Sequence, residues 1–245
     1  VKESIDNPLK YYINNTQKTI EFLKAFSKSG IKNFIFSSTA AVYGEQEKKM
    51  ISEDDKTNPI NPYGKSKLMS ENIIKDSLNK LNSRFIIFRY FNVAGSDPYN
   101  RTGQISNNAT HLIKVASETA VGKRKKMSLF GNNYNTKDGT CIRDYIHVYD
   151  LANAHINGLK HLLNGGNSIT LNCGYNKGYS VLEVINTVKK ISGEDFQVDI
   201  EPPRIGDPTC LIANSSKLKN LLKWRPEKDN LELIIEDALN WEKNN

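Results

Sequence analysis

Two short apolar runs joined by a long helical pattern constrain the fold of this chain more than any other feature. Residues 34–36 and 85–88 are continuous apolar runs with the length of buried strands. Between them, Asn61 and Pro62 supply a helix N-cap and a proline at the first helical position, which predicts a helix from there to about Leu81. Strand, crossover helix and strand together predict parallel pairing with a right-handed connection. We therefore expect an α/β fold built on a parallel sheet.

The rest of the chain divides at about residue 93. Before it, apolar positions at helical spacing predict a helix over residues 8–29 that stops at Gly30. After it come longer loops rich in Asn, Gly and Asp, which suggest a second, smaller lobe. Its helices are expected near residues 105–121, 150–163, 180–192 and 229–242, with a strand at 169–171. We infer a sheet domain over residues 1–92 and a second lobe that occupies mainly residues 93–245, with about 141–172 returning to the first domain.

The composition is that of a globular protein. Hydrophobic residues make up 38% of the chain and charged residues 25%, which argues against disorder. No apolar run reaches the ~18 residues of a membrane span, and the first residues lack the apolar core of a secretory signal. The three cysteines form no C-x-x-C pair, and the four histidines lack metal-ligand spacing. We expect reduced thiols in the cytoplasm, no metal site and no membrane contact.

The net charge of +7 favours anionic partners, and small molecules that carry phosphate satisfy it as well as nucleic acid does. A dense basic run, residues 123–126, follows a helical segment that ends near Gly122. Basic side chains there complement the helix dipole and solvate a loop. No aromatic residues are interleaved with them. We therefore expect no nucleic-acid partner.

Residue types suited to proton transfer follow the first predicted strand and open the predicted helix. Thr39 ends the strand, and Tyr63 and Lys67 lie four residues apart, on one face of the helix. A hydroxyl, a phenol and an ammonium group that converge on one point suit proton transfer to or from an alcohol oxygen. Ligands of parallel sheets bind outside the carboxyl ends of the strands, where Thr39 and Asn92 both fall. This pattern indicates a dehydrogenase or an epimerase.

One expected feature of a nucleotide-binding sheet is missing. None of the fifteen glycines forms G-x-G-x-x-G or a related phosphate-binding loop behind an early strand. A doubly wound nucleotide domain normally opens with that turn. We therefore expect that this sequence starts in the middle of such a domain.

Taken in order, the motifs resemble those of the extended short-chain dehydrogenases/reductases, and within them the UDP-glucose (UDP-galactose) 4-epimerases. The matching segments are residues 11–15 (YYINN), 36–44 (FSSTAAVYG), 62–67 (PYGKSK), 89–92 (RYFN), 130–131 (FG), 138–147 (DGTCIRDYIH) and 204–207 (RIGD). The resemblance implies a Rossmann-type sheet, incomplete at the N-terminus, with NAD as bound cofactor and a UDP-hexose as substrate. It also implies an isomerase that forms homodimers, for which the helices at 8–29 and 62–81 are the candidate interface.

The resemblance also implies roles for single residues. Tyr63 is the candidate base, and Lys67 with the nicotinamide ring would favour its phenolate form. Thr39 would bind the hexose O4 and position its proton. The cofactor-lining residues are Asn14, Ser37, Tyr63, Lys67 and Tyr90.

The substrate-lining residues are Thr39, Phe91, Asn92, Asn108, Phe130, Arg143, Arg204, Asp207 and Leu211. Asn92 should bind the diphosphate or the sugar. Asn108, Arg143 and Arg204 would bind the diphosphate, Phe130 the uracil and Asp207 the region of the uridine ribose. At Leu211 the family places a side chain that gates the sugar pocket. Because leucine is smaller than the tyrosine that excludes N-acetylated hexoses, we expect activity on UDP-GlcNAc and UDP-GalNAc as well as on UDP-glucose and UDP-galactose.

Three alternatives stay open at this point. Sugar-nucleotide dehydratases of the same superfamily place Asp-Glu where this chain has Ala40 and Ala41, which counts against dehydration. A UDP-uronate epimerase would need a further cation near the sugar C6. A non-catalytic protein that binds sugar nucleotides would also account for the missing glycine loop.

Overall fold

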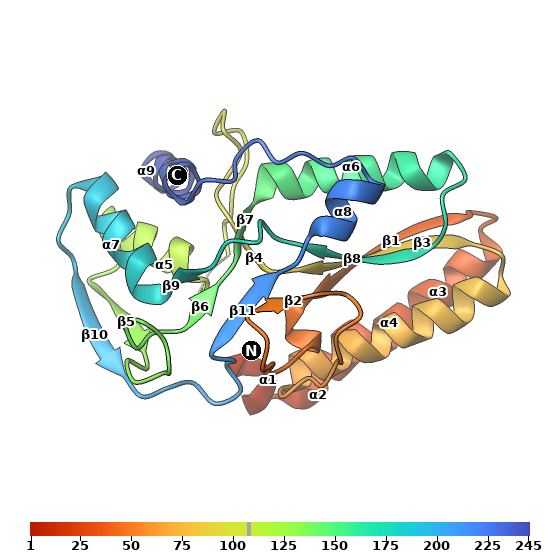
Figure 1. The fold of residues 1–245 in the computed structure, drawn as a ribbon, viewed down its shortest axis with the longest axis horizontal. Coiled ribbons are helices and arrows are strands. Elements are labelled where there is room, and N and C mark those ends of the chain that lie inside the picture. The colour runs from red at the N-terminus through yellow and green to blue at the C-terminus, as the bar shows by residue number, and fades with distance from the viewer. Residues whose placement is uncertain (107–108) are drawn as a thin grey trace.

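The computed structural model describes residues 1–106 and 109–245, and a three-stranded parallel sheet lies at its centre (Figure 1). The strands are β1 (Asn33–Thr39), β3 (Arg84–Tyr90) and β8 (Ile169–Cys173), in the order β1-β3-β8. The register places Thr39 beside Tyr90 and Tyr90 beside Cys173, so the carboxyl ends of all three strands meet at one edge. The predicted parallel α/β fold is confirmed.

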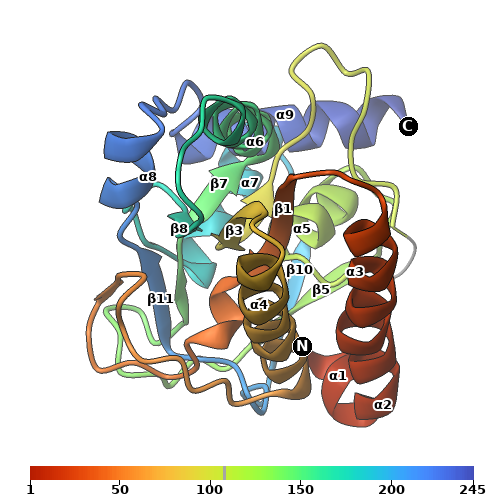
Figure 2. The same cartoon turned by 90° about the vertical axis from the view of Figure 1, so that its right-hand side faces the viewer.

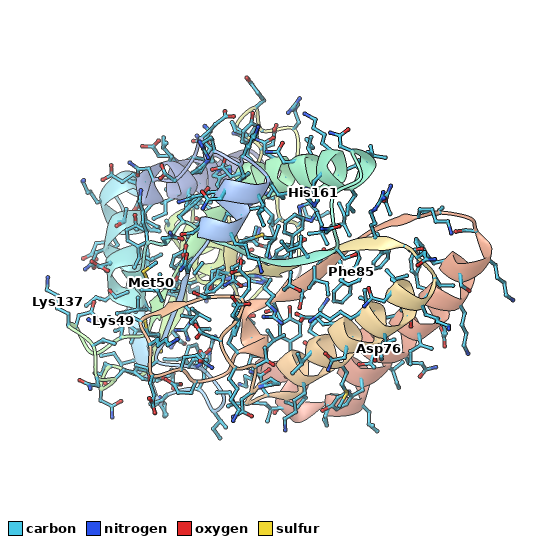
Figure 3. The ribbon with its side chains drawn as sticks, turned by 45° about the vertical axis from the view of Figure 1, so that its right-hand side comes forward. Lys49, Met50, Asp76, Phe85, Lys137 and His161 are labelled. Atoms are coloured by element: carbon cyan, nitrogen blue, oxygen red, sulfur yellow. The ribbon has the colours of Figure 1, made fainter. Side chains whose placement is uncertain are left out.

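Helices cover both faces of this sheet (Figures 1 and 2). On one face lie α3 (Lys18–Lys28) and α4 (Pro62–Lys80), and on the other lies α6 (Val148–Leu163). Phe85 (labelled in Figure 3) and Ile87 of β3 belong to one apolar cluster with Leu78 of α4, whereas Ile86 and Phe88 belong to the core that includes α6. Successive side chains of a strand point to opposite faces, which explains why the whole run 85–88 is apolar.

The N-terminal helix predicted over 8–29 is interrupted. After α1 (Lys2–Asp6), the structure has α2 (Pro8–Tyr11), a π-helical segment η1 (Tyr12–Gln17), and then α3. The widened turn leaves the carbonyl of Asn15 to accept hydrogen bonds from the hydroxyls of Thr19 and Ser70. Periodicity does not distinguish a single widened turn from an α-helix, and such turns are frequent at functional sites. Gly30 follows α3 with a φ of 75°, as its predicted role requires.

The structure contains more short strands and helices than were predicted, most of them in the C-terminal half. The helices α5 (Leu112–Ala120), α7 (Val181–Ser192) and α9 (Leu231–Asn244) pack against one another and extend the main apolar core beyond the sheet. The helix predicted from 105 begins at Leu112 instead. The segments that were not predicted are β2 (Met50–Ile51), β4 (Asn92–Ala94), β5 (Lys126–Phe130), β6 (Ile142–Arg143), β7 (Tyr145–His147), β9 (Tyr179–Ser180), β10 (Gln197–Glu201), β11 (Cys210–Ala213), α8 (Ser216–Leu221) and the short 3₁₀ helix η2 (Ala40–Val42).

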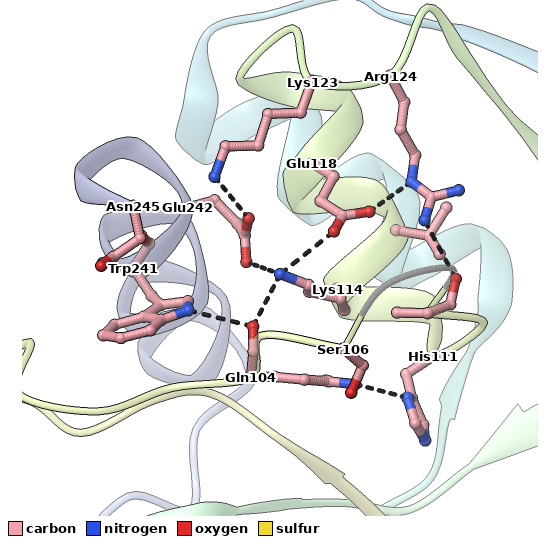
Figure 4. Close-up of polar contacts among 12 residues, drawn as sticks. Gln104, Ser106, His111, Lys114, Glu118, Lys123, Arg124, Trp241, Glu242 and Asn245 are labelled. Carbon is pink, nitrogen blue, oxygen red and sulfur yellow. Dashed lines mark hydrogen bonds and ion pairs between the residues drawn. The ribbon is translucent and has the colours of Figure 1, made fainter.

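The basic run 123–126 is paired with acidic side chains and is not a purely solvated loop. Figure 4 shows Lys123 reaching Glu242 of α9 (3.0 Å), while Arg124 bonds Glu118 of α5. Lys114 joins both carboxylates, so the network connects α5 to the last turn of α9. The partners lie more than a hundred residues apart in two of these pairs, which is why the sequence pattern did not reveal them. Within the described residues, no helix is both long enough and apolar enough to cross a membrane.

Candidate active site

The end of β1 and the start of α4 bring the predicted catalytic side chains together. Asn61 caps α4 by accepting a hydrogen bond from the backbone N–H of Gly64 (2.9 Å), as its position before Pro62 predicted. Its side-chain amide also donates to the carbonyl of Gly206 (3.2 Å). The first turn of α4 is therefore held against the segment that carries Asp207.

Thr39 and Tyr63 form the centre of the site. Thr39 is buried at the end of β1, and its Oγ1 accepts a hydrogen bond from the backbone N–H of Ala41 (3.1 Å). Burial raises the pKa of Tyr63, and a hydrogen bond from Thr39 opposes that rise. Since the Thr39 oxygen already accepts from Ala41, its O–H proton can be directed at Tyr63 or at a substrate oxygen.

Lys67 lies one turn along α4 but is directed at the strand. Its ammonium group donates to the carbonyl of Ser37 (2.9 Å) and lies 5.0 Å from the ring centre of Phe36. Burial lowers the pKa of Lys67, and the negative charge of Glu71 opposes the change. The resemblance implies that Lys67 and the nicotinamide ring together favour the phenolate form of Tyr63. Among the described protein residues, burial is the largest effect and raises the pKa of Tyr63.

Two further predicted cofactor residues meet at the same edge of the sheet. The hydroxyls of Ser37 and Tyr90 lie 2.7 Å apart, at the ends of the neighbouring strands β1 and β3. Asn14 is exposed on η1. Its neighbour Asn15 is the residue that reaches α4, where its amide donates to the hydroxyl of Ser66 (2.9 Å). Asn15 thus connects η1 to α4, and the cofactor-lining role of Asn14 stays a prediction.

A buried ion pair beneath this edge was not predicted. Both carboxylate oxygens of Glu71 accept from the guanidinium of Arg89, at 3.0 and 2.7 Å, and Ser38 donates to the same carboxylate at 2.5 Å. Arg89 also donates to the hydroxyl of Tyr43 (2.9 Å), which donates to the amide oxygen of Asn172 on β8 (2.7 Å). Burial alone would lower the pKa of Arg89, but Glu71 raises it above its ordinary value. The network ties α4 to all three strands.

The residues predicted to bind UDP gather around the end of β5. The guanidinium of Arg204 lies 3.8 Å from the ring centre of Phe130, and Arg143 pairs with Asp207 at 3.2 Å. Burial would lower the pKa of Arg143, and Asp207 raises it. The buried Nε of Arg204 has no hydrogen-bond partner among the residues that the structure describes. A half-buried guanidinium with a spare donor suits an anionic ligand.

Three of the remaining predicted substrate residues, Phe91, Asn92 and Leu211, lie in or next to strands. Phe91 and Leu211 are buried and pack in one apolar cluster with Ala40, directly beside Thr39 in the sequence. Asn92 opens β4, and its backbone N–H donates to the carbonyl of Asp144 (2.9 Å). Asn108 lies outside the described residues.

Comparison with known proteins gives a consistent result. The family described as GDP-mannose 4,6 dehydratase matches residues 1–237. The UDP-glucose 4-epimerase of Azospirillum brasilense is 49% identical over 243 residues, which are 99% of this chain and 70% of that protein. The UDP-Glc/GlcNAc 4-epimerase of Campylobacter jejuni has 50% identity and a TM-score of 0.81, over 99% of this chain and 74% of the other. The Bifidobacterium longum UDP-glucose 4-epimerase in complex with NAD⁺ and UDP has 36% identity and a TM-score of 0.95, over 100% of this chain and 73% of the other.

A parallel sheet with a Ser/Thr hydroxyl at the end of one strand, and with Tyr and Lys four residues apart in the helix that follows, defines the class of short-chain dehydrogenases/reductases, as the motifs indicated. The chain belongs to the extended branch of that class and, within it, to the UDP-glucose 4-epimerase family. It is an isomerase of the epimerase type.

Proposed function

We propose that this protein interconverts UDP-glucose and UDP-galactose by way of a 4-keto sugar, with NAD as a bound cofactor. The observation that carries the proposal is the meeting of Thr39, Tyr63 and Lys67 at the carboxyl edge of a parallel sheet. Bound NAD would accept a hydride from C4 of the hexose and return it to the opposite face. The hydroxyl of Ser37, the ammonium of Lys67 and the phenol of Tyr90 gather there and suit the polar groups of a nicotinamide riboside.

The protein's own part in this reaction is to hold the sugar and to move the O4 proton. Tyr63 takes that proton in one half-reaction and returns it in the other, while Thr39 binds O4 and directs the transfer. Ala40 and Ala41 place methyl groups where a dehydratase would need carboxylates, so elimination of water lacks its acid and base. This supports epimerisation over dehydration.

The diphosphate would lie between Arg143 and Arg204. Guanidinium groups match phosphate oxygens with two parallel hydrogen bonds, and the spare Nε of Arg204 would gain a partner on binding. Phe130, stacked on Arg204, presents its ring for the uracil, and Asp207 would lie by the ribose.

Leu211 supports a wider substrate range. It packs with Phe91 beside Thr39, so its size sets the room near the sugar. Purified full-length protein with NAD⁺ is expected to convert UDP-galactose to UDP-glucose and UDP-GalNAc to UDP-GlcNAc. Chromatography of the nucleotide sugars measures both conversions. If neither is converted, the proposed function fails. If UDP-GalNAc alone is left unchanged, the wider range fails.

A single substitution should separate these two activities. We expect Leu211→Tyr to lower turnover of UDP-GalNAc at least about tenfold more than turnover of UDP-galactose, since the larger side chain would fill the room that the N-acetyl group needs and such differences in fit are worth about 1–3 kcal/mol. The same change at Ile200, a 64% exposed position on β10, is the control and should leave the ratio of the two activities unaltered. An unchanged ratio in Leu211→Tyr would remove this residue from the specificity argument.

We also propose that two copies of the chain associate through α3 and α4. A shallow groove between these helices is lined by the apolar residues Ile20, Leu23, Ile73 and Leu81 and by the polar residues Lys24, Ser27, Ser77 and Lys80. Apolar side chains accompanied by polar ones are typical of an interface, and a second copy would supply a matching face. In a twofold-symmetric dimer, the same groove on each subunit would be buried against the other.

Sedimentation of the full-length protein should then show a dimer at micromolar concentration. Ile20→Glu, at a 38% exposed position, is expected to shift the protein to monomer, because it places a charge in the apolar face. Leu159→Glu on the outer face of α6 is the matched control and should stay dimeric. A monomeric parent protein, or a dimeric Ile20 variant, would exclude this interface.

A further inference from the structure

A chain of hydrogen bonds runs from α6 to the end of β1 through Tyr90. The imidazole Nδ1 of His155 lies 2.8 Å from the carbonyl oxygen of Leu151, and its Nε2 lies 2.6 Å from the hydroxyl of Tyr90. That hydroxyl lies 2.7 Å from Oγ of Ser37. The imidazole packs between aromatic rings, with ring centres 4.8 Å from Phe88 and 5.6 Å from Tyr90. None of the roles described above uses His155.

The chemical groups that take part in this series of hydrogen bonds determine which of them donate and which accept. A carbonyl oxygen can only accept, so Nδ1 of His155 must carry a proton. In a neutral imidazole the other nitrogen, Nε2, is then an acceptor. Tyr90 has a single O–H proton and must donate it to Nε2. Burial raises the pKa of Tyr90, which keeps that proton available.

The consequence appears at Ser37. Because the Tyr90 proton is used by His155, the Tyr90 oxygen accepts the hydroxyl proton of Ser37. The Ser37 Oγ then presents lone pairs, and not a donor, to a ligand beyond the strand end. The backbone carbonyl of the same residue is held by Lys67 (2.9 Å). Tyr90 thus orients the side chain of Ser37, and Lys67 holds its backbone carbonyl.

We propose that His155 is a positioning residue that, as the neutral Nδ1–H tautomer, fixes Tyr90 and makes the Ser37 hydroxyl an acceptor toward the cofactor. This inference rests on the proposed function for the identity of the ligand. The carboxamide of a nicotinamide ring carries two N–H donors, which an acceptor at Ser37 would match. His155 acts through Tyr90 and Ser37 and does not itself touch the cofactor.

The tautomer can be measured without any cofactor. In full-length protein labelled with ¹⁵N-histidine, long-range ¹H–¹⁵N correlations at neutral pH should show one imidazole with Nδ1 protonated and Nε2 bare. Its assignment to His155 follows from its loss in His155→Gln. Tyr90→Phe removes the donor and should move the Nε2 resonance. An Nε2–H tautomer, an imidazolium pattern, or an Nε2 resonance that ignores Tyr90→Phe would overturn the proposal.

Binding of NAD⁺ supplies the second measurement. His155→Phe should raise the Kd for NAD⁺ about tenfold, the equivalent of one lost hydrogen bond of about 1.4 kcal/mol. His155→Gln can still offer an acceptor to Tyr90 and should restore most of the affinity. His161→Gln, six residues further along α6, is the control, since within the described structure the imidazole of His161 bonds only to the carbonyl of Asn167. Equal affinities in the Phe and Gln variants would contradict the role of His155, whereas failure of the unaltered protein to bind NAD⁺ would contradict the proposed function.

Discussion

Replacing Tyr63 with phenylalanine should lower the turnover of UDP-galactose by about 10²- to 10⁴-fold, the usual contribution of a positioned acid–base group. The substitution removes only the phenolic oxygen, which we propose accepts and returns the proton of the hexose O4. The neighbouring Thr39 keeps its hydrogen bond to the backbone of Ala41, so the strand end should stay in place. Steady-state kinetics should show the loss mainly in kcat, with little change in KM.

Tyr11, whose ring packs against that of Tyr63, provides a matched control. Tyr11 packs edge-to-face against Tyr63 with ring centres 6.0 Å apart, and its hydroxyl bonds Glu3 at the surface. Tyr11→Phe therefore removes a phenol from the same aromatic pair but outside the proposed chemistry, and we expect turnover within about twofold of the parent. If Tyr63→Phe were as active as Tyr11→Phe, Tyr63 would not be the acid–base group.

Glu71→Gln should destabilise the folded protein by about 3–5 kcal/mol, measured by urea unfolding. Glu71 is fully buried and Arg89 nearly so, and the substitution leaves a buried guanidinium without its counter-charge. It also weakens the hydrogen bond that Ser38 donates to this carboxylate. The loss should exceed that of any exposed ion pair in the chain, because exposed pairs typically contribute about 0–1 kcal/mol.

Two comparisons make this result interpretable. Asp76→Asn removes a carboxylate from the exposed face of the same helix (Figure 3), and its cost should be within about 0.5 kcal/mol. Glu71→Leu combined with Arg89→Met removes both charges and should be less destabilised than Glu71→Gln. If Glu71→Gln proved as mild as Asp76→Asn, the buried pair would not hold α4 to the sheet.

Local sequence patterns were sufficient to predict the helix and the strands that surround the proposed site. The alternation of β1 and β3 with α4 could be predicted because an apolar run of strand length, a capped helix start and helical periodicity are properties of neighbouring residues. The cap at Asn61 and the stop at Gly30 were predictable for the same reason. Short strands such as β6 and β9 were missed because two residues carry no detectable period.

Local sequence patterns could not predict the buried network of Glu71 and Arg89. Glu71 falls in the apolar stripe of α4 with Ile74 and Leu78, and a charge in that stripe is a signal that a buried partner exists. The identity of the partner, Arg89, depends on how the helix crosses the sheet. The same holds for His155, whose partner Tyr90 lies on another element 65 residues away.

The sequence by itself determined the parallel α/β fold, the membership of the epimerase family and the set of polar residues at the strand ends, since each depends on order and spacing along the chain. The tertiary structure decided which polar side chains meet: Asn15 with Ser66 of α4, Lys67 with the carbonyl of Ser37, and Arg204 with the ring of Phe130. It also decided the direction of the Tyr63 pKa, because burial depends on everything packed around the side chain and not on its neighbours in sequence.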